Sequence, residues 1–230
     1  MNKNNYSNTY FKNRDHLDVQ HAQYIKSFLE KYSLSKVLDV GCGTGRLVKF
    51  LDQHGFSAQG CEPEIAALKI AQRINSSKSI KKAPATSLPY KANSFDLIIS
   101  ASVIEHLTKK EVRKFLEEAK RVLKPHGYIF IITPNFSSPF RYIKKEQWFA
   151  YSDPTHINFF SRKSIRQLLT SSGFHNINFQ FKTLYNKSLN QTLPPYLQNL
   201  PAPIKKSLFF LMFSTPLSAL RDSLWVSAQK

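Results

Sequence analysis

The sequence predicts an α/β fold in which helices cover both faces of a mostly parallel sheet. Short aliphatic and aromatic runs, typical of buried strands, alternate along the chain with stretches of helical spacing. One such run, residues 37–40, leads directly into a glycine-rich turn and then into a helical pattern, as in the first unit of a nucleotide-binding sheet. The length of 230 residues fits one domain of this kind with room for a modest insertion.

Five helices are expected where apolar residues recur every three or four positions: 17–32, 46–53, 64–74, 109–123 and 161–172. Gly55 supplies a C-cap glycine for the second helix, and Pro63 starts the third in the position that proline favours. Thr108 and Glu111 form a capping-box pattern ahead of the fourth helix. Ser161 is the expected N-cap of the fifth.

Seven strands are expected between these helices and turns: 37–40, 56–61, 80–83, 94–100, 128–132, 174–181 and 223–230. Residues 124–127, Lys-Pro-His-Gly, predict the turn into the fifth strand. We expect a single domain over 1–230, with a polar N-terminal tail at 1–16. Residues 183–222 form an insertion before the last strand, rich in proline and with an apolar run at 208–213.

The spacing of the glycines separates two kinds of nucleotide ligand. A dinucleotide-binding turn requires the pattern G-x-G-x-x-G, whose third glycine would fall at Arg46. This chain has Gly41, Gly43 and Gly45 instead, with the acidic Asp39 just ahead of them. Because glycine has no Cβ, the backbone of this turn can approach a ligand closely. An ordinary glycine-rich turn is the alternative interpretation, which Asp39, the three glycines and the flanking strand and helix disfavour.

This pattern resembles the first motif of class I S-adenosyl-L-methionine (SAM) methyltransferases. The resemblance is strongest to the branch that includes ubiquinone-type O-methyltransferases, and it covers about residues 17–182 and 223–230. Further matching strings are Val-Ile-Glu-His-Leu at 103–107, Leu-Lys-Pro-x-Gly at 123–127, Thr-Pro-Asn at 133–135 and Asp-Pro-x-His at 153–156. The resemblance implies a Rossmann-like sheet of seven strands, SAM as the cofactor and S-adenosyl-L-homocysteine as its product.

The resemblance also assigns cofactor contacts. The glycine turn would pack against the methionine part of SAM, with Asp39 orienting the turn and the amino group. Glu62 ends the second strand, 23 residues after Asp39, where a carboxylate can bind a ribose diol. The turn after the third strand resembles the adenine-binding turn, although Pro84 occupies its usual acidic position. The expected cofactor-binding residues are Asp39, Gly41, Cys42, Gly43, Gly45, Glu62, Pro63, Ala85, Thr86, Ser100 and Ala101.

Two histidines are candidates for a general base, which is needed only if the acceptor must lose a proton. His106 follows the fourth strand and His156 lies in the loop after the fifth, at the same edge of the sheet. Each is open to a structural role instead. Some related enzymes bind a metal through E-x-x-E-H, but Ser102 replaces the first glutamate here. Because Mg²⁺ prefers carboxylates and water, we expect no metal.

The composition limits the kinds of partner and the cellular compartment that we expect. Lys and Arg number 33 against 15 Asp and Glu, which gives a net charge of +18 and favours anionic partners. Two cysteines, Cys42 and Cys61, exclude a disulfide scaffold and a zinc ribbon. The N-terminal residues lack the apolar core of a signal peptide, and 208–213 is too short to span a bilayer, so we expect a cytoplasmic protein.

Residues 183–222 have two possible roles. An apolar run flanked by lysines suits either a lid over the acceptor or contact with the inner face of an anionic membrane. Both favour a small-molecule or lipid-linked acceptor, methylated at oxygen. Nucleic acid is the less favoured partner, which leaves an RNA methyltransferase (2′-O or base) as an alternative. A non-catalytic scaffold with this fold is a further alternative.

Overall fold

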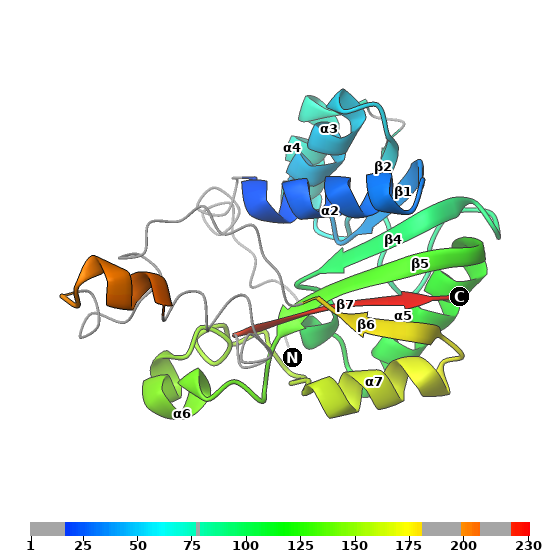
Figure 1. Ribbon diagram of the computed structural model, residues 1–230. Coiled ribbons are helices and arrows are strands. Elements are labelled where there is room, and N and C mark those ends of the chain that lie inside the picture. The colour runs from blue at the N-terminus through cyan, green and yellow to red at the C-terminus, as the bar shows by residue number, and fades with distance from the viewer. Residues whose placement is uncertain (1–16, 77–78, 181–198, 208–221) are drawn as a thin grey trace.

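A computed structural model describes residues 17–76, 79–180, 199–207 and 222–230 (Figure 1). Seven strands form one sheet in the order β3-β2-β1-β4-β5-β7-β6, in which only β7 is antiparallel to its neighbours. The strands are β1 Lys36–Val40, β2 Ser57–Cys61, β3 Ile80–Lys81, β4 Phe95–Ala101, β5 Leu123–Pro134, β6 His175–Phe179 and β7 Ser223–Gln229. The predicted α/β fold with a mostly parallel sheet is confirmed.

Helices cover both faces of the sheet, as the alternation of side chains along the central strands requires (Figure 1). Leu38 and Ile98 face a core that α5 and α7 complete, whereas their neighbours Val37 and Leu97 face a second core that α2, α3 and α4 complete. The helices are α2 Val19–Lys31, α3 Arg46–Gln53, α4 Ile65–Ile74, α5 Lys109–Val122, α6 Phe140–Lys144 and α7 Arg162–Ser171. Two single 3₁₀ turns are η1 Ile104–His106 and η2 Lys145–Gln147.

Most of the helix ends follow from local sequence. Gly55 adopts φ +85° just after α3, and Thr108 and Glu111 form both bonds of the capping box at α5. Ser161 caps α7 by accepting from the Ser164 N–H. Pro63, however, does not begin α4, because Glu64 stays extended and acts as the N-cap. The backbone N–H of Glu64 is instead bonded to the Glu62 carboxylate, which delays the helix by one residue.

Two strands differ from the sequence-based expectation. β3 is paired only at Ile80 and Lys81, because only Gly60 and Cys61 of β2 lie opposite it. β5 begins earlier than expected, at Leu123, which pairs with Phe95. Between this pair and the next, Leu97 with Tyr128, residues 124–127 have no partners on β4 and form the predicted turn as a bulge within the strand.

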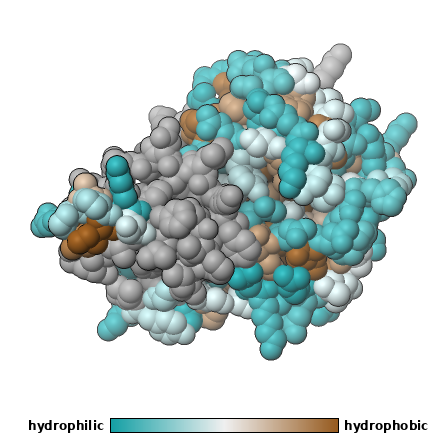
Figure 2. Space-filling view, in the orientation of Figure 1, coloured by the Kyte–Doolittle hydropathy of each residue, from teal (hydrophilic) through white to brown (hydrophobic). Residues whose placement is uncertain are grey.

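The predicted N-terminal tail lies outside the described residues. So does most of the predicted insertion at 183–222, of which 199–207 and 222 are described; residues 202–207 are helical. Hydrophilic side chains dominate the described surface in Figure 2, as expected of a chain with 21% charged residues. Within the described part of the chain, none of the helices has the length and apolar character to span a bilayer.

Candidate cofactor and catalytic site

The glycine turn is bound to the end of β2. Gly41, Gly43 and Gly45 all adopt positive φ, at 72°, 54° and 74°. The backbone N–H groups of Gly41 and Cys42 both donate to the Cys61 carbonyl, at 2.9 and 3.0 Å. Because left-handed backbone is costly for residues with a Cβ, these three positions explain why the turn is made of glycine.

The first and second glycines differ in what surrounds them, which gives a test. A Cβ on Gly41 would lie 2.6 Å from Val103 Cγ2, whereas a Cβ on Gly43 would meet no atom within 4 Å. Val103 has little χ1 freedom to move away. We therefore expect Gly41→Ala to destabilise the fold by about 2–4 kcal/mol, combining backbone strain with overpacking. Gly43→Val should lose less stability but fill the cavity next to the turn.

Urea unfolding and SAM calorimetry on both variants measure this difference. Gly55→Ala is the matched control, because Gly55 also has positive φ and open space but lies away from the turn. Equal loss of stability at Gly41 and Gly55 would contradict the proposed contact with Val103.

A cavity of about 200 Å³ lies beside the turn, at the carboxyl ends of β1 and β4. Five of the predicted cofactor residues line it together: Asp39, Gly41, Cys42, Gly43 and Ala101. In open α/β sheets this edge of the sheet is where ligands bind.

Asp39 lies in the wall of this cavity and is 5% exposed. Burial, with a further contribution from the charge of Glu62, raises the pKa of Asp39 to about 7. A buried carboxylate of this kind is best stabilised by a cation that enters the cavity with a ligand. This supports the predicted contact with the amino group of SAM.

Glu62 is joined to the glycine turn by a hydrogen bond. One carboxylate oxygen accepts the N–H of Gly43 at 2.9 Å, and the other accepts the N–H of Glu64 at 2.9 Å. Burial raises the pKa of Glu62, although the two backbone bonds oppose this shift. Because each carboxylate oxygen has a second lone pair, Glu62 can still accept hydrogen bonds from two hydroxyls of a bound ligand.

The other predicted cofactor residues do not line the cavity. Gly45 is the N-cap of α3, and Pro63 precedes the N-cap of α4. Ala85 and Thr86 form a turn after β3, and Ser100 is fully buried within β4. Their contacts with the cofactor remain predictions.

Sequence reasoning missed the residues that α2 contributes to the cavity. Asp18 and His21 line it from the start of this helix, where Asp18 is the N-cap and accepts the N–H groups of Gln20 and His21 at 3.1 Å. The His21 ring packs edge-on against Trp225, with ring centroids 4.6 Å apart. The capping signal was visible in the sequence. The position of the helix over the cavity depends on β7, which is about 200 residues away along the chain.

The two candidate histidines lie side by side, with ring centroids 4.7 Å apart. His106 belongs to η1, and His156 belongs to the loop after β5. Hydrogen bonds from the N–H groups of Ile157 and Asn158 to the Glu105 carbonyl hold that loop against η1. His156 Nδ1 lies 2.7 Å from the Ala150 carbonyl, so Nδ1 carries the proton and Nε2 keeps a lone pair.

A carboxylate and a hydroxyl orient His106. The Thr155 hydroxyl donates to Asp153 Oδ1, so its oxygen accepts from His106 Nδ1 at 2.9 Å. Asp153 also lies 3.9 Å from His156 Nε2. Burial acts to raise the pKa of Asp153, but the bonds from Thr155 and the nearby histidines outweigh it and lower that pKa. Asp153 therefore remains ionised beside both rings.

A second carboxyl group completes this cluster. Glu105 is 1% exposed, and burial raises its pKa to about 7 despite a hydrogen bond from the Thr133 hydroxyl. Donor atoms of Glu105, His106 and His156 lie within 4.8 Å of one another. Two imidazoles and one carboxylate are a ligand set that suits Zn²⁺ better than Mg²⁺. This ligand set differs from the two-carboxylate metal site that was considered from the sequence.

The cluster is linked to the glycine turn through Val103. A Cβ on Gly41 would lie 2.6 Å from Val103 Cγ2, and the Val103 carbonyl accepts the N–H of His106 at 3.0 Å. Ala101, five residues before His106, lines the cavity itself. A cavity beside a glycine turn, at the carboxyl ends of parallel strands, is the arrangement of an enzyme that binds a nucleoside cofactor. The fold and the cavity together define the class of SAM-dependent methyltransferases.

Comparison with known proteins supports this class. The chain belongs to the methyltransferase-domain family, whose model matches residues 8–178. The mitochondrial ubiquinone biosynthesis O-methyltransferase of Rattus norvegicus is 36% identical over 108 residues, covering 44% of this chain and 31% of that protein. The tRNA (carboxymethyluridine(34)-5-O)-methyltransferase of Arabidopsis thaliana is 34% identical over 109 residues, covering 46% and 26%.

The solved structure of a SAM-dependent methyltransferase from Archaeoglobus fulgidus has the same fold, with a TM-score of 0.60 at 20% identity over 91% of this chain and 94% of that one. The matched part of the chain spans about a third of the length of the curated relatives named above. The family and the fold establish a SAM-dependent methyltransferase domain with SAM as its cofactor.

Proposed function

We propose that this chain transfers the methyl group of SAM to an oxygen atom of a small, apolar or lipid-linked acceptor. The observation that carries the proposal is the position of Val103, which lies close to Gly41 of the glycine turn and immediately precedes η1, the turn that carries His106. Bound SAM supplies a methyl group that is already activated by the positive sulfonium. The chain then has to align the acceptor with that methyl group and remove the hydroxyl proton.

The histidine cluster is suited to the second task. His106 is proposed to accept the acceptor's proton at Nε2, because its Nδ1 is held by Thr155 and because Val103, just before η1, lies close to the glycine turn. The imidazolium that forms is stabilised by Asp153, which lies within reach of both histidines. His156 fixes the packing of the His106 ring and shares the charge.

The acceptor class follows from the segment after β5. Aromatic rings there pack on one another around Trp148 and Phe159, and two of them, Phe149 (44%) and Tyr151 (40%), are exposed. Tyr142, beside Arg141, is 70% exposed. The guanidinium of Arg141 lies 3.9 Å from the centroid of the Phe136 ring. Exposed aromatic rings beside a cationic side chain are suited to binding an apolar acceptor at an anionic surface.

An assay with methyl-labelled SAM tests the acceptor class. The full chain is incubated with extracted anionic lipid, with neutral lipid and with total RNA, and the label is followed into the organic or nucleic-acid fraction. We expect label in the organic fraction and more of it with anionic lipid. Label confined to RNA would replace this proposal by the second candidate below.

RNA is the second candidate acceptor. The net charge of +18 favours it, and a relative at 34% identity is named as a tRNA methyltransferase. An RNA-binding enzyme releases counterions, so its affinity should fall steeply as salt rises from 50 to 200 mM. Flat or absent RNA binding over that range would remove this candidate.

Replacing the proposed base should slow turnover without weakening cofactor binding. We expect His106→Asn to lower kcat about 10²–10⁴-fold, because asparagine cannot accept the acceptor's proton. The SAM dissociation constant should change less than threefold. His175→Asn, an exposed histidine on β6, is the control and should behave as wild type.

The same assay decides between a base and a metal at the cluster. Once an acceptor has been identified, turnover should continue after dialysis of the protein against EDTA, in keeping with the expectation that no metal is used. Loss of turnover with EDTA and recovery with Zn²⁺ would assign Glu105, His106 and His156 to a metal and remove the base from His106.

A further inference from the structure

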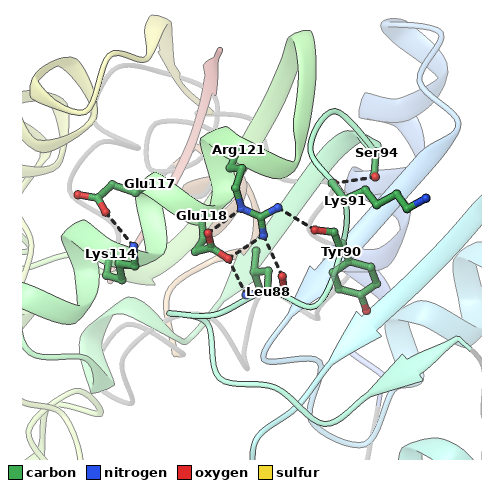
Figure 3. Close-up of polar contacts among 8 residues, drawn as sticks. All are labelled: Leu88, Tyr90, Lys91, Ser94, Lys114, Glu117, Glu118 and Arg121. Atoms are coloured by element: carbon green, nitrogen blue, oxygen red, sulfur yellow. Dashed lines mark hydrogen bonds and ion pairs between the residues drawn. The ribbon is translucent and has the colours of Figure 1, made fainter.

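A salt-bridged pair on α5 holds the loop that joins β3 to β4 (Figure 3). Arg121 donates from Nη1 to the Tyr90 carbonyl at 2.8 Å and from Nη2 to the Leu88 carbonyl at 2.9 Å. Glu118, three residues earlier, accepts the Leu88 N–H at 2.8 Å. Both backbone polar groups of Leu88 are therefore bound by side chains of one helix.

The pair is pre-organised for this task. Arg121 binds Glu118 through Nε at 2.7 Å and through Nη2 at 2.8 Å, in a two-bond arrangement that a planar guanidinium permits and an ammonium does not. Figure 3 shows the guanidinium between the carboxylate and the two loop carbonyls. Since the fork is fixed by Glu118, the loop carbonyls are held at a defined place relative to α5.

The held segment is short, and its other anchors are the burial of Ala85 and Leu88 in the core and a hydrogen bond from Lys81 Nζ to the Pro89 carbonyl. The Ser87 N–H closes a turn with the Pro84 carbonyl at 3.1 Å, so Ala85 and Thr86 form its tip. On the far side, the Tyr90 hydroxyl donates to the Gly60 carbonyl of β2 at 2.9 Å. Residues 88–90, which directly follow the turn, are thus bound to both α5 and β2, and the pair on α5 fixes where the turn ends.

The order of the strands indicates which part of a bound ligand would lie next to this turn. β1, β2 and β3 are neighbours, and their carboxyl ends carry, in that order, the glycine turn, Glu62 and the turn at 84–87. A SAM molecule with its amino acid at Asp39 and its ribose at Glu62 therefore has its base next to Ala85 and Thr86. This step rests on the function proposed above.

We propose that Arg121 and Glu118 are positioning residues for adenine recognition. Pro84 provides no side-chain hydrogen bond, so we assign recognition of the base to backbone N–H and C=O groups of the turn. Backbone groups cannot adjust by rotating, so their placement decides whether they match the adenine edge. Arg121 and Glu118 control that placement without touching the ligand.

The test measures discrimination between bases, which a purely structural role would not change. Calorimetry compares S-adenosyl-L-homocysteine with its inosine counterpart, in which the 6-amino donor is a carbonyl acceptor and N1 bears a proton. In wild type we expect the adenine ligand to bind at least about 30-fold tighter. In Arg121→Gln this ratio should fall below about 5, mainly through weaker binding of the adenine ligand.

Matched variants separate the possible causes. Arg113→Gln removes an exposed arginine from the same helix and should leave the ratio unchanged. Arg121→Lys keeps the charge but loses the fork, so it should resemble Arg121→Gln. Glu118→Gln keeps an oxygen that can accept the Leu88 N–H, so the preference for the adenine ligand should fall only in part. This variant tests the prediction if Arg121→Gln fails to fold.

The outcomes are distinct. If wild type binds the adenine ligand and Arg121→Gln keeps the wild-type ratio, the positioning role is wrong and the proposed function stands. If wild type binds neither ligand, the cofactor site itself is wrong and the positioning role falls with it. A wild-type ratio near 1 would also overturn the inference, because no adenine recognition would exist to be positioned.

Discussion

Asp39→Asn is expected to abolish SAM binding and, at pH 8, to stabilise the unliganded protein. The folded-state pKa of Asp39 is about 7, above its ordinary value of 3.8, because the carboxyl is buried near Glu62. Between these two pH values the folded chain holds a proton that the unfolded chain has lost. The stability that this proton contributes is full below pH 4 and is lost as the pH rises through 7.

Asparagine carries no charge at any pH, so the variant escapes that loss. We expect about 1–3 kcal/mol of added stability at pH 8 and little change at pH 4. Urea unfolding at both pH values measures it. Asp52→Asn, an exposed position on α3, is the control. A variant that is less stable than wild type at pH 8 would show that the buried Asp39 is ionised without strain.

The same shift predicts how wild-type binding depends on pH. The amino group of SAM requires an ionised Asp39, so affinity should weaken as the pH falls below 7, by at most tenfold for each pH unit. Calorimetry at pH 7 in buffers of different ionisation enthalpy should also show the release of a proton on binding. No proton release would contradict the assignment.

Glu62→Gln should weaken SAM binding at least 100-fold although the two side chains have the same shape. Both carboxylate oxygens accept backbone N–H groups, from Gly43 and Glu64. An amide must turn its NH₂ toward one of these donors, which displaces the glycine turn. It also loses charged hydrogen bonds to the ribose, at about 1.5–3 kcal/mol each.

Glu64→Gln is the matched control, because it removes a charge two residues away while keeping the backbone donor. Its SAM affinity should stay within about twofold of wild type. Unchanged binding in Glu62→Gln would remove Glu62 from the ribose site. No SAM binding by the wild type would favour the alternative of a non-catalytic scaffold.

Much of the fold could be predicted because its signals are local. The glycine turn, the capping box at Thr108 and the cap at Ser161 each involve residues within four positions of one another. The bulge in β5 could not be predicted, because it arises from the register against β4 rather than from its own residues. Likewise Glu64 became a cap only through its bond to Glu62.

The site divides in the same way. Asp39 and the glycines stand next to one another in the sequence, so their meeting in the cavity was foreseeable. The contact of His106 with Thr155 joins residues 49 positions apart, and its proton assignment depends on Asp153. The role of Arg121 was invisible in the sequence, because an arginine in the last turn of a helix is ordinarily explained by the helix dipole.

The antiparallel β7 has a consequence for the order of folding. β6 joins the sheet only through β7, and β7 pairs Gln229 with Tyr128, residues 101 positions apart. The five parallel strands from β3 to β5 can assemble from nearer contacts, but β6 and the edge of β5 must wait for β7. Because distant pairings are slow to form, we expect a late kinetic phase in refolding, in which β6 becomes protected from hydrogen exchange after β1 and β4.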